Sequence, residues 1–229
     1  CGNKILFYNG KFAQVYEVGQ EAGPQVLGNF ESLSSASAMT ADCVVQCTGN
    51  KIEAVDFAGK SQFVIQVPES EGEVAYVDAR TRYMAVVTTT NCIKMFDITR
   101  KPFKQVGITR RFEKKAGVPL GEIKDIALNA DGKKLCILAD QQPFPSIRIP
   151  DTKFYVYDID MDNFMEHQVQ NNRVPLEAFW DQSDKRLLAI ETEYIKDLGR
   201  GTTMDDDLAA GGKALDNIKL EEIEEDFNK

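Results

Sequence analysis

The chain has 229 residues, of which 27 are Lys or Arg and 36 are Asp or Glu, so its formal net charge is −9. A field of this sign repels phosphate backbones, which argues against nucleic acid as a partner. Hydrophobic residues make up 43% of the chain, enough for a core. No run approaches the ~18 apolar residues that a membrane span needs, so direct membrane insertion is not expected.

The first predicted elements form a β-hairpin. Lys4–Tyr8 and Lys11–Val18 are strand-like runs on either side of Asn9-Gly10. Asn and Gly tolerate the positive φ angles that a tight hairpin turn requires. The chain begins at Cys1 and enters a strand almost at once, with no leader pattern. We therefore expect a fragment of a longer polypeptide.

Further pairs of strand-like runs joined by a short connection follow along the chain and predict further hairpins. Each of the later ones is preceded by one more run and a polar turn, and several are followed by a more polar strand. We expect units of four strands, with the inner strands the most apolar because they are covered on both faces. The hairpins are Cys43–Thr48 with Lys51–Phe57, Tyr83–Thr89 with Cys92–Ile98, Lys134–Ala139 with Phe154–Ile159, and a fifth beginning at Arg186–Glu191. The preceding runs are Val74–Asp78, Ile123–Leu128 and Leu176–Trp180; the following ones are Phe63–Val67, Phe103–Ile108 and Phe164–Val169.

One short pattern recurs at the end of a strand in four hairpins: an aromatic or apolar residue followed by an acid. The acids are spaced 39, 41 and 61 residues apart, and the last spacing equals one more period plus an insertion. A period of about 40–45 residues with a Trp-Asp-like pair is typical of a WD-type propeller blade. We therefore predict an all-β fold, with residues 1–194 forming about four blades of an incomplete WD40-type β-propeller. The pairs are Tyr16-Glu17, Val55-Asp56, Phe96-Asp97 and Tyr157-Asp158.

Two segments depart from the blade pattern. The insertion between Ala139 and Phe154 holds three prolines, which favours an extended surface loop. Its Ile147 and Ile149 either contact a partner or fold back on the blade. Residues 195–229 are acidic and predicted to be flexible, with a short amphipathic helix from about Leu215 to Phe227 that docks on protein.

Candidate catalytic and metal-binding residues are few. Asp158, Asp160, Asp162 and Asn163 imitate the start of a calcium loop, but Val169 stands at the twelfth position and the sixth is not Gly. A strand end and turn is the better interpretation. Asp205–Asp207 are interpreted as solvated acids, and Gly211–Ala214 lacks the remaining parts of a phosphate loop. His167 has no Ser or Cys nucleophile to serve. We predict no catalytic, cofactor-binding or metal-binding residue, and no cofactor.

The cysteines, the tryptophan and one basic stripe have structural interpretations. The odd number of cysteines indicates free thiols in a reducing compartment, and the spacing of Cys43 and Cys47 does not fit a redox or zinc pair. Trp180 is interpreted as a core anchor rather than an interface hot spot. The basic stripe, Arg110-Arg111 with Lys114-Lys115, could touch an acidic surface, but a solvated loop is favoured. The cysteines are Cys1, Cys43, Cys47, Cys92 and Cys136.

The segment Ala178–Leu188 resembles a strand-turn-strand of WD-repeat subunits of intraflagellar transport complexes, with a core subunit of complex A as the best match. Lys94–Ile98 and Phe154–Asp162 resemble its two preceding blades, in the same order and spacing. The resemblance covers roughly Cys43 to Tyr194. The chain departs from standard WD repeats because it lacks Gly-His dipeptides and the Trp-Asp pair itself. We therefore expect the blade edges to be held mainly by apolar packing and ladder hydrogen bonds.

The resemblance implies a non-catalytic scaffold of the intraflagellar transport A complex. Its implied partners are other subunits of that complex and cargo adaptors, in a hetero-oligomeric assembly that supports retrograde ciliary transport and ciliary import of membrane cargo. Its implied location is the cytoplasm, the cilium or flagellum, and the ciliary base. One alternative is a propeller subunit of another coat-like vesicle or trafficking complex. Another is a propeller hydrolase or lyase with carboxylates at the central channel, although the sequence shows no such cluster.

Overall fold

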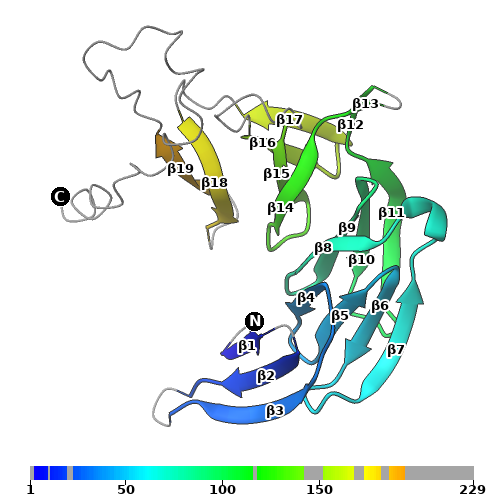
Figure 1. The fold of residues 1–229 in the computed structure, drawn as a ribbon, viewed down its shortest axis with the longest axis vertical. Coiled ribbons are helices and arrows are strands. Elements are labelled where there is room, and N and C mark those ends of the chain that lie inside the picture. The colour runs from blue at the N-terminus through cyan, green and yellow to red at the C-terminus, as the bar shows by residue number, and fades with distance from the viewer. Residues whose placement is uncertain are drawn as a thin grey trace, which may run out of the picture. The chain divides into compact units, whose positions relative to one another are not determined.

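The computed structural model describes residues 3–9, 11–19, 23–115, 118–141, 152–167, 173–181 and 186–193. The chain divides into Cys1–Tyr194 and Ile195–Lys229, and every described residue lies in the first part. The predicted helix at Leu215–Phe227 and the loop residues Ile147 and Ile149 lie outside the described residues. Within them, the only helical element is a 3-10 turn at Glu69–Glu71, and almost everything else with regular structure is β-strand (Figure 1).

The strands form a series of antiparallel sheets, each built from strands that follow one another in the chain. The first sheet contains β1 (Lys4–Tyr8), β2 (Phe12–Glu17) and β3 (Gln25–Glu31). The second contains β4 (Ala36–Met39), β5 (Val44–Thr48), β6 (Lys51–Val55) and β7 (Ser61–Gln66). The third contains β8 (Val74–Ala79), β9 (Tyr83–Thr88), β10 (Cys92–Asp97) and β11 (Lys104–Arg111).

The fourth sheet contains β14 (Glu122–Leu128), β15 (Lys134–Asp140), β16 (Thr152–Asp158) and β17 (Asn163–His167). The fifth pairs β18 (Arg173–Trp180) with β19 (Leu187–Glu193). A small hairpin of β12 (Glu113–Lys115) and β13 (Val118–Pro119) joins the third sheet to the fourth. The first four hairpins therefore lie where the sequence predicts them, whereas the run at Arg186–Glu191 is part of β19, which pairs with the preceding strand β18, and the residues after it lie outside the described ones.

The sheets are the blades of a propeller. Their first strands contact one another in series, β4 with β8, β8 with β14, and β14 with β18. Figure 1 shows these strands on one side of the successive sheets, with β3, β7 and β11 on the opposite side. An all-β propeller with consecutive four-stranded blades was predicted from the repeat, and this fold class is confirmed.

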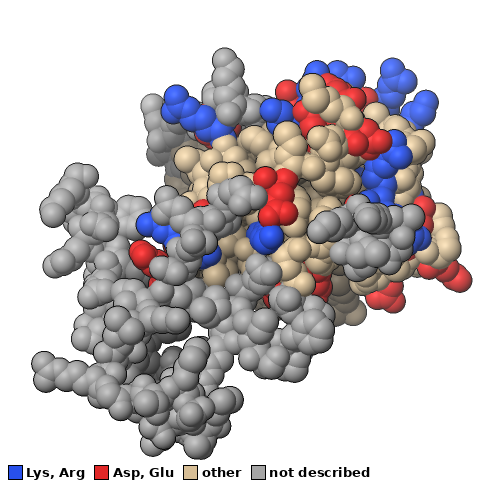
Figure 2. All heavy atoms as spheres, turned by 90° about the horizontal axis from the view of Figure 1, so that it is seen from above, with Lys and Arg blue, Asp and Glu red and all other residues tan. Residues whose placement is uncertain are grey.

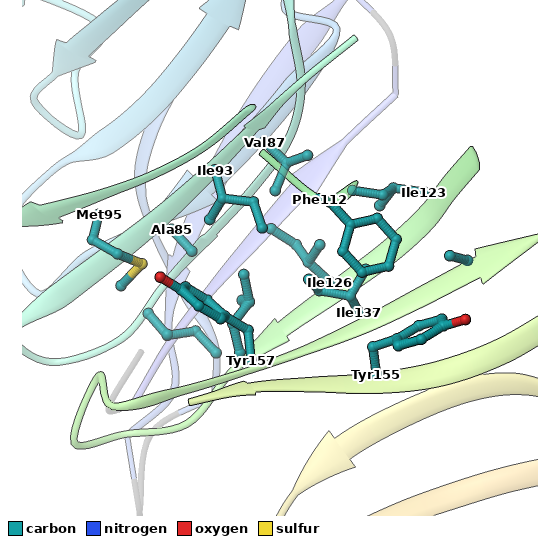
Figure 3. Close-up of a cluster of buried hydrophobic side chains, with 13 residues drawn as sticks. Ala85, Val87, Ile93, Met95, Phe112, Ile123, Ile126, Ile137, Tyr155 and Tyr157 are labelled. Carbon is teal, nitrogen blue, oxygen red and sulfur yellow. The ribbon is translucent and has the colours of Figure 1, made fainter. Parts of the chain in front are cut away.

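Apolar packing between neighbouring blades forms the core. Between the third and fourth blades, Phe112 meets the ring of Tyr155 edge-on at 5.1 Å between centroids. Figure 3 shows Phe112 beside Ile123 and Ile137, while Met95 and Tyr157 lie on the other side of the same cluster. Fully burying one such side chain contributes about 1.5–3 kcal/mol. A second buried cluster joins the second and third blades.

The expectation that the inner strands are the most apolar is wrong in detail. The most buried strands are β9, β10 and β15, which occupy the middle of their sheets. The first strands β8 and β14 keep several half-exposed residues. A middle strand has a neighbouring strand on both sides and a blade on both faces, whereas a first strand has one edge without a partner in its sheet.

The four recurring acids lie at the turn after the second strand of the first blade and the third strand of the others. The Asp56 carboxylate accepts hydrogen bonds from the N–H groups of Ala58 at 3.0 Å and Lys60 at 2.9 Å. Asp97 accepts from the N–H and hydroxyl of Thr99 at 2.9 and 2.6 Å. Asp158 accepts from the Met161 N–H at 3.0 Å. These three Asp side chains therefore close their turns, as Asp side chains commonly do, whereas Glu17 pairs with Lys4.

Polar contacts between blades supplement the apolar packing. The Asp78 carboxylate accepts a hydrogen bond from the Leu128 N–H at 2.7 Å, and the Arg80 side chain donates to the Leu128 carbonyl at 2.6 Å. Arg80 and Asp78 also form an ion pair at 3.0 Å. Burial raises the pKa of Asp78. These polar contacts join the third blade to the fourth, in addition to the apolar packing and ladder bonds that were expected to be the main contacts.

Gly28 on β3 provides a test of blade packing. A Cβ added there would lie 1.5 Å from the Phe57 carbonyl oxygen, which belongs to the next blade. Because the clash is with backbone, we expect Gly28→Ala to destabilise the propeller by about 3 kcal/mol. Hydrogen exchange in the full-length protein, followed at β3 and β6, measures the change.

Gly23→Ala is the matched control for this variant. A Cβ at Gly23 meets no atom within 4 Å, so we expect a change of less than about 1 kcal/mol. Equal exchange rates in the two variants would contradict the packing that places β3 against the Phe57 carbonyl.

The hydrogen bonds of Asp97 lead us to predict that the stability of the protein depends on pH. Hydrogen bonds from the Thr99 hydroxyl and N–H lower its pKa in the folded state. Its contribution to stability should be complete above the unfolded pKa of about 3.9 and be lost as pH falls through the lower folded pKa. The stability difference between the wild type and Asp97→Asn should therefore shrink on acidification.

Pulse proteolysis of the full-length protein across this pH range measures the difference. Glu69→Gln, on the exposed 3-10 turn, is the control for loss of an acidic charge. A difference between the wild type and Asp97→Asn that stays constant down to pH ~2 would show that the Asp97 carboxylate does not stabilise its turn through its charge.

Candidate protein-interaction site

The acids that imitate a calcium loop face different partners. Asp160 pairs with Lys133 at 2.9 Å, while Asp162 accepts a hydrogen bond from the Tyr157 hydroxyl at 2.8 Å and forms an ion pair with Arg110. With Asp158 closing its turn, the three side chains do not converge. Among the described residues, no group of three or more His, Cys, Asp or Glu is placed to hold a metal ion, and no helix is long and apolar enough to span a membrane.

The described cysteines are buried free thiols. Burial raises the pKa of Cys47 and of Cys136 to about 12, so both are protonated at neutral pH. Burial also raises the pKa of Cys43, whose sulfur lies 3.1 Å from the Thr40 hydroxyl. The buried thiols pack as small apolar groups, and Cys47 and Cys136 lack the thiolate that a nucleophile or metal ligand needs. Cys1 lies outside the described residues.

The other sequence candidates offer no catalytic arrangement. His167 is exposed at the end of β17, with its ring 6.4 Å from that of Phe154. Asp205–Asp207 and Gly211–Ala214 lie outside the described residues. Trp180 is half-buried on β18, packs beside a buried cluster, and donates its indole N–H to the Ala127 carbonyl at 2.8 Å. Trp180 therefore joins the fifth blade to the fourth.

The basic stripe was predicted to be a solvated loop, and this prediction is wrong because its residues lie on strands. Arg110 and Arg111 lie on strand β11, and Lys114 and Lys115 belong to β12. Arg110 pairs with Asp162, and Arg111 lies 4.0 Å from Glu113. On the face shown in Figure 2, basic and acidic side chains likewise lie beside one another.

A groove lies between the outer part of the third blade and the fourth. Its volume is about 230 Å³. Val106 and Ile108 on β11 form one wall and are 42% and 65% exposed. Buried Met95 and Tyr157 contribute to its floor, and the Arg110–Asp162 ion pair stands at its rim. The groove combines an apolar interior with a charged edge, which suits recognition of a protein segment.

An irregularity in β11 creates this groove. Between the pairs Ile93↔Arg110 and Met95↔Val106, β10 advances two residues while β11 advances four. The extra residues form a bulge around Gly107, whose φ of 68° lies in the left-handed region that favours glycine. This site was not predicted from the sequence, although a glycine inside a strand pattern is a known signal for a bulge.

Two further apolar surfaces lie on the first and fifth sheets. Phe7 and Phe12 are 57% and 43% exposed beside a cavity of about 360 Å³ on the first sheet. Leu176 and Leu188 are exposed on the fifth sheet. These surfaces belong to sheets with three and two described strands, so they differ from the groove between two four-stranded blades.

Comparison with known proteins supports this architecture. Residues 1–171 match the family described as the IFT140 second beta-propeller. The chain is similar to the crystal structure of the N-terminal domain of Nup159, with 13% identity and a TM-score of 0.50 over 72% of this chain and 46% of that one. It is also similar to the Cps50 (Swd1) β-propeller domain of Myceliophteria thermophila, with 10% identity and a TM-score of 0.56 over 82% of this chain and 62% of that one.

At these identities the two structures support the fold alone, and the chain spans about half to three fifths of their lengths. The family match is more informative, because it extends over most of the chain and includes all four strand-end acids together with the groove. The chain therefore belongs to the IFT140 second β-propeller family and is a propeller related to the intraflagellar transport A complex.

Proposed function

We propose that this propeller is a non-catalytic scaffold of the intraflagellar transport A complex. Its exposed blade surfaces contact other subunits of the complex and cargo adaptors within a hetero-oligomeric assembly. In this role it supports retrograde ciliary transport and the import of membrane cargo into the cilium. The protein acts in the cytoplasm, at the ciliary base, and along the cilium or flagellum.

The single observation that carries this proposal is the family match over residues 1–171. The structure adds physical support, because its irregular features produce contact surfaces and its described acids serve turns and ion pairs. A hydrolase or lyase would need carboxylates gathered around a substrate, whereas Asp56, Asp97 and Asp158 each close a turn on their own blade. A scaffold role is therefore favoured over catalysis.

The blade core provides the test. Phe112 is fully buried between the third and fourth blades, and Phe112→Ala should cost about 3–5 kcal/mol. In ciliated cells that depend on the full-length variant, we expect fewer complex A subunits to co-purify with it. We also expect its ciliary cargo to accumulate, because retrograde return fails. Quantitative mass spectrometry and live imaging measure these two effects.

Val64→Asp is the control, since Val64 is 46% exposed on β7 and outside this core. It should leave assembly and transport near the wild-type level. Normal assembly and transport with a demonstrably unfolded propeller would refute the scaffold role. Co-purification of a vesicle coat in place of complex A would favour the alternative, a propeller subunit of another trafficking complex.

A further inference from the structure

Strand β11, one wall of the groove, has the opposite charge character from the chain as a whole, while the lining itself holds one cation, Arg110, and one anion, Asp162. Strand β11 carries Lys104, Arg110 and Arg111 and contains no acid, while the chain has a net charge of −9. At physiological ionic strength the Debye length is about 8 Å, so a partner at this edge responds mainly to the local charges. A negatively charged partner is therefore favoured here.

The ion pairs at the rim leave room for such a partner. The side chains of Arg110 and Asp162 are about two fifths exposed, and Arg111 is half exposed at 4.0 Å from Glu113. Exposed pairs of this kind contribute little to stability. A carboxylate of a partner can thus share or replace Asp162 at the planar Arg110 guanidinium, which has several donors.

The interior of the groove selects an aliphatic side chain. Val106 and Ile108 stand on one wall, and the buried floor includes Met95 and Tyr157. The volume of about 230 Å³ is smaller than the 300–1,000 Å³ typical of small-molecule pockets. Because β11 is the edge strand of its sheet, the groove is accessible along an extended chain.

We propose that this groove binds an extended acidic segment of another protein. An aliphatic side chain of that segment packs against Val106 and Ile108, and a neighbouring carboxylate meets Arg110. Burial of the two exposed apolar residues supplies binding energy, while the cations of β11 set the required charge. This inference goes beyond the scaffold role, because peptide capture can fail while the complex still assembles.

A peptide of alternating Glu and Leu, labelled with fluorescein, tests the proposal on the full-length protein. We expect binding by fluorescence anisotropy, and a matched peptide with Lys in place of Glu should bind at least about tenfold more weakly, equivalent to about 1.4 kcal/mol. Ile108→Asp should weaken binding of the Glu/Leu peptide by at least about tenfold. Because Ile108 is 65% exposed, this variant should keep its fold.

Charge reversal at the rim gives a second, independent readout. Arg110→Glu should lower the affinity for the Glu/Leu peptide and raise the affinity for the Lys/Leu peptide. Simple loss of folding would not produce this exchange of preference. Val64→Asp places the same new charge on the outer strand of the second blade and should change neither affinity by more than about twofold.

Several outcomes would overturn the proposal. These are no binding of the Glu/Leu peptide, equal binding of the Glu/Leu and Lys/Leu peptides, or an unchanged affinity in Ile108→Asp. Binding that appears only after residues 195–229 are replaced by a neutral linker would show that the chain's own acidic segment occupies the groove. Reduced complex A assembly with intact peptide binding would instead bear on the scaffold role alone.

Discussion

Face-to-face packing of neighbouring blades is the constraint on which the rest of this structure depends. A four-stranded sheet cannot cover both of its own faces, so each blade must bury one face against the blade before it and the other against the blade after it. Phe112, Ile137 and Tyr155 meet this requirement between the third and fourth blades. The close approach at Gly28 shows the same constraint acting on backbone, because no side chain fits between β3 and the Phe57 carbonyl.

The recurring acids explain why the blade repeat can be recognised in the sequence, although the chain lacks the Gly-His and Trp-Asp pairs of standard WD repeats. Packing fixes the distance between blades, but the chain must also reverse its direction at the correct residue after each strand. Asp56, Asp97 and Asp158 fix that reversal by binding backbone N–H groups of the following turn. Glu17 has a longer side chain and instead reaches Lys4 on β1, at 3.6 Å. The repeat spacing visible in the sequence therefore reflects the Asp residues that stabilise the turn at the same place in successive blades.

The sequence was sufficient for the fold class and for most hairpins, because turns and apolar runs are local features. It did not reveal β3 or β4. Strand β4 has small residues, Ala-Ser-Ala-Met, and β3 has an internal glycine, so neither carries a strong apolar pattern. The groove also escaped prediction. It depends on the register between β10 and β11 and on Tyr157 from the next blade, which are non-local relationships that one sequence does not display.

A repeating scaffold gains distinct surfaces where it departs from its repeat, and β11 shows how such a departure is held in place. Lys94 is 5% exposed, and its amine pairs with Glu71 at 2.6 Å and donates to the Thr109 hydroxyl at 2.8 Å. A buried charge is costly unless it is paired, so Lys94 restricts the positions that Thr109 can take. Ile108, the preceding residue, lines the groove. The buried Lys94 thus anchors Thr109 on the groove wall, and the bulge around Gly107 lies on the other side of Ile108, which makes the wall a preorganised surface rather than a loose edge.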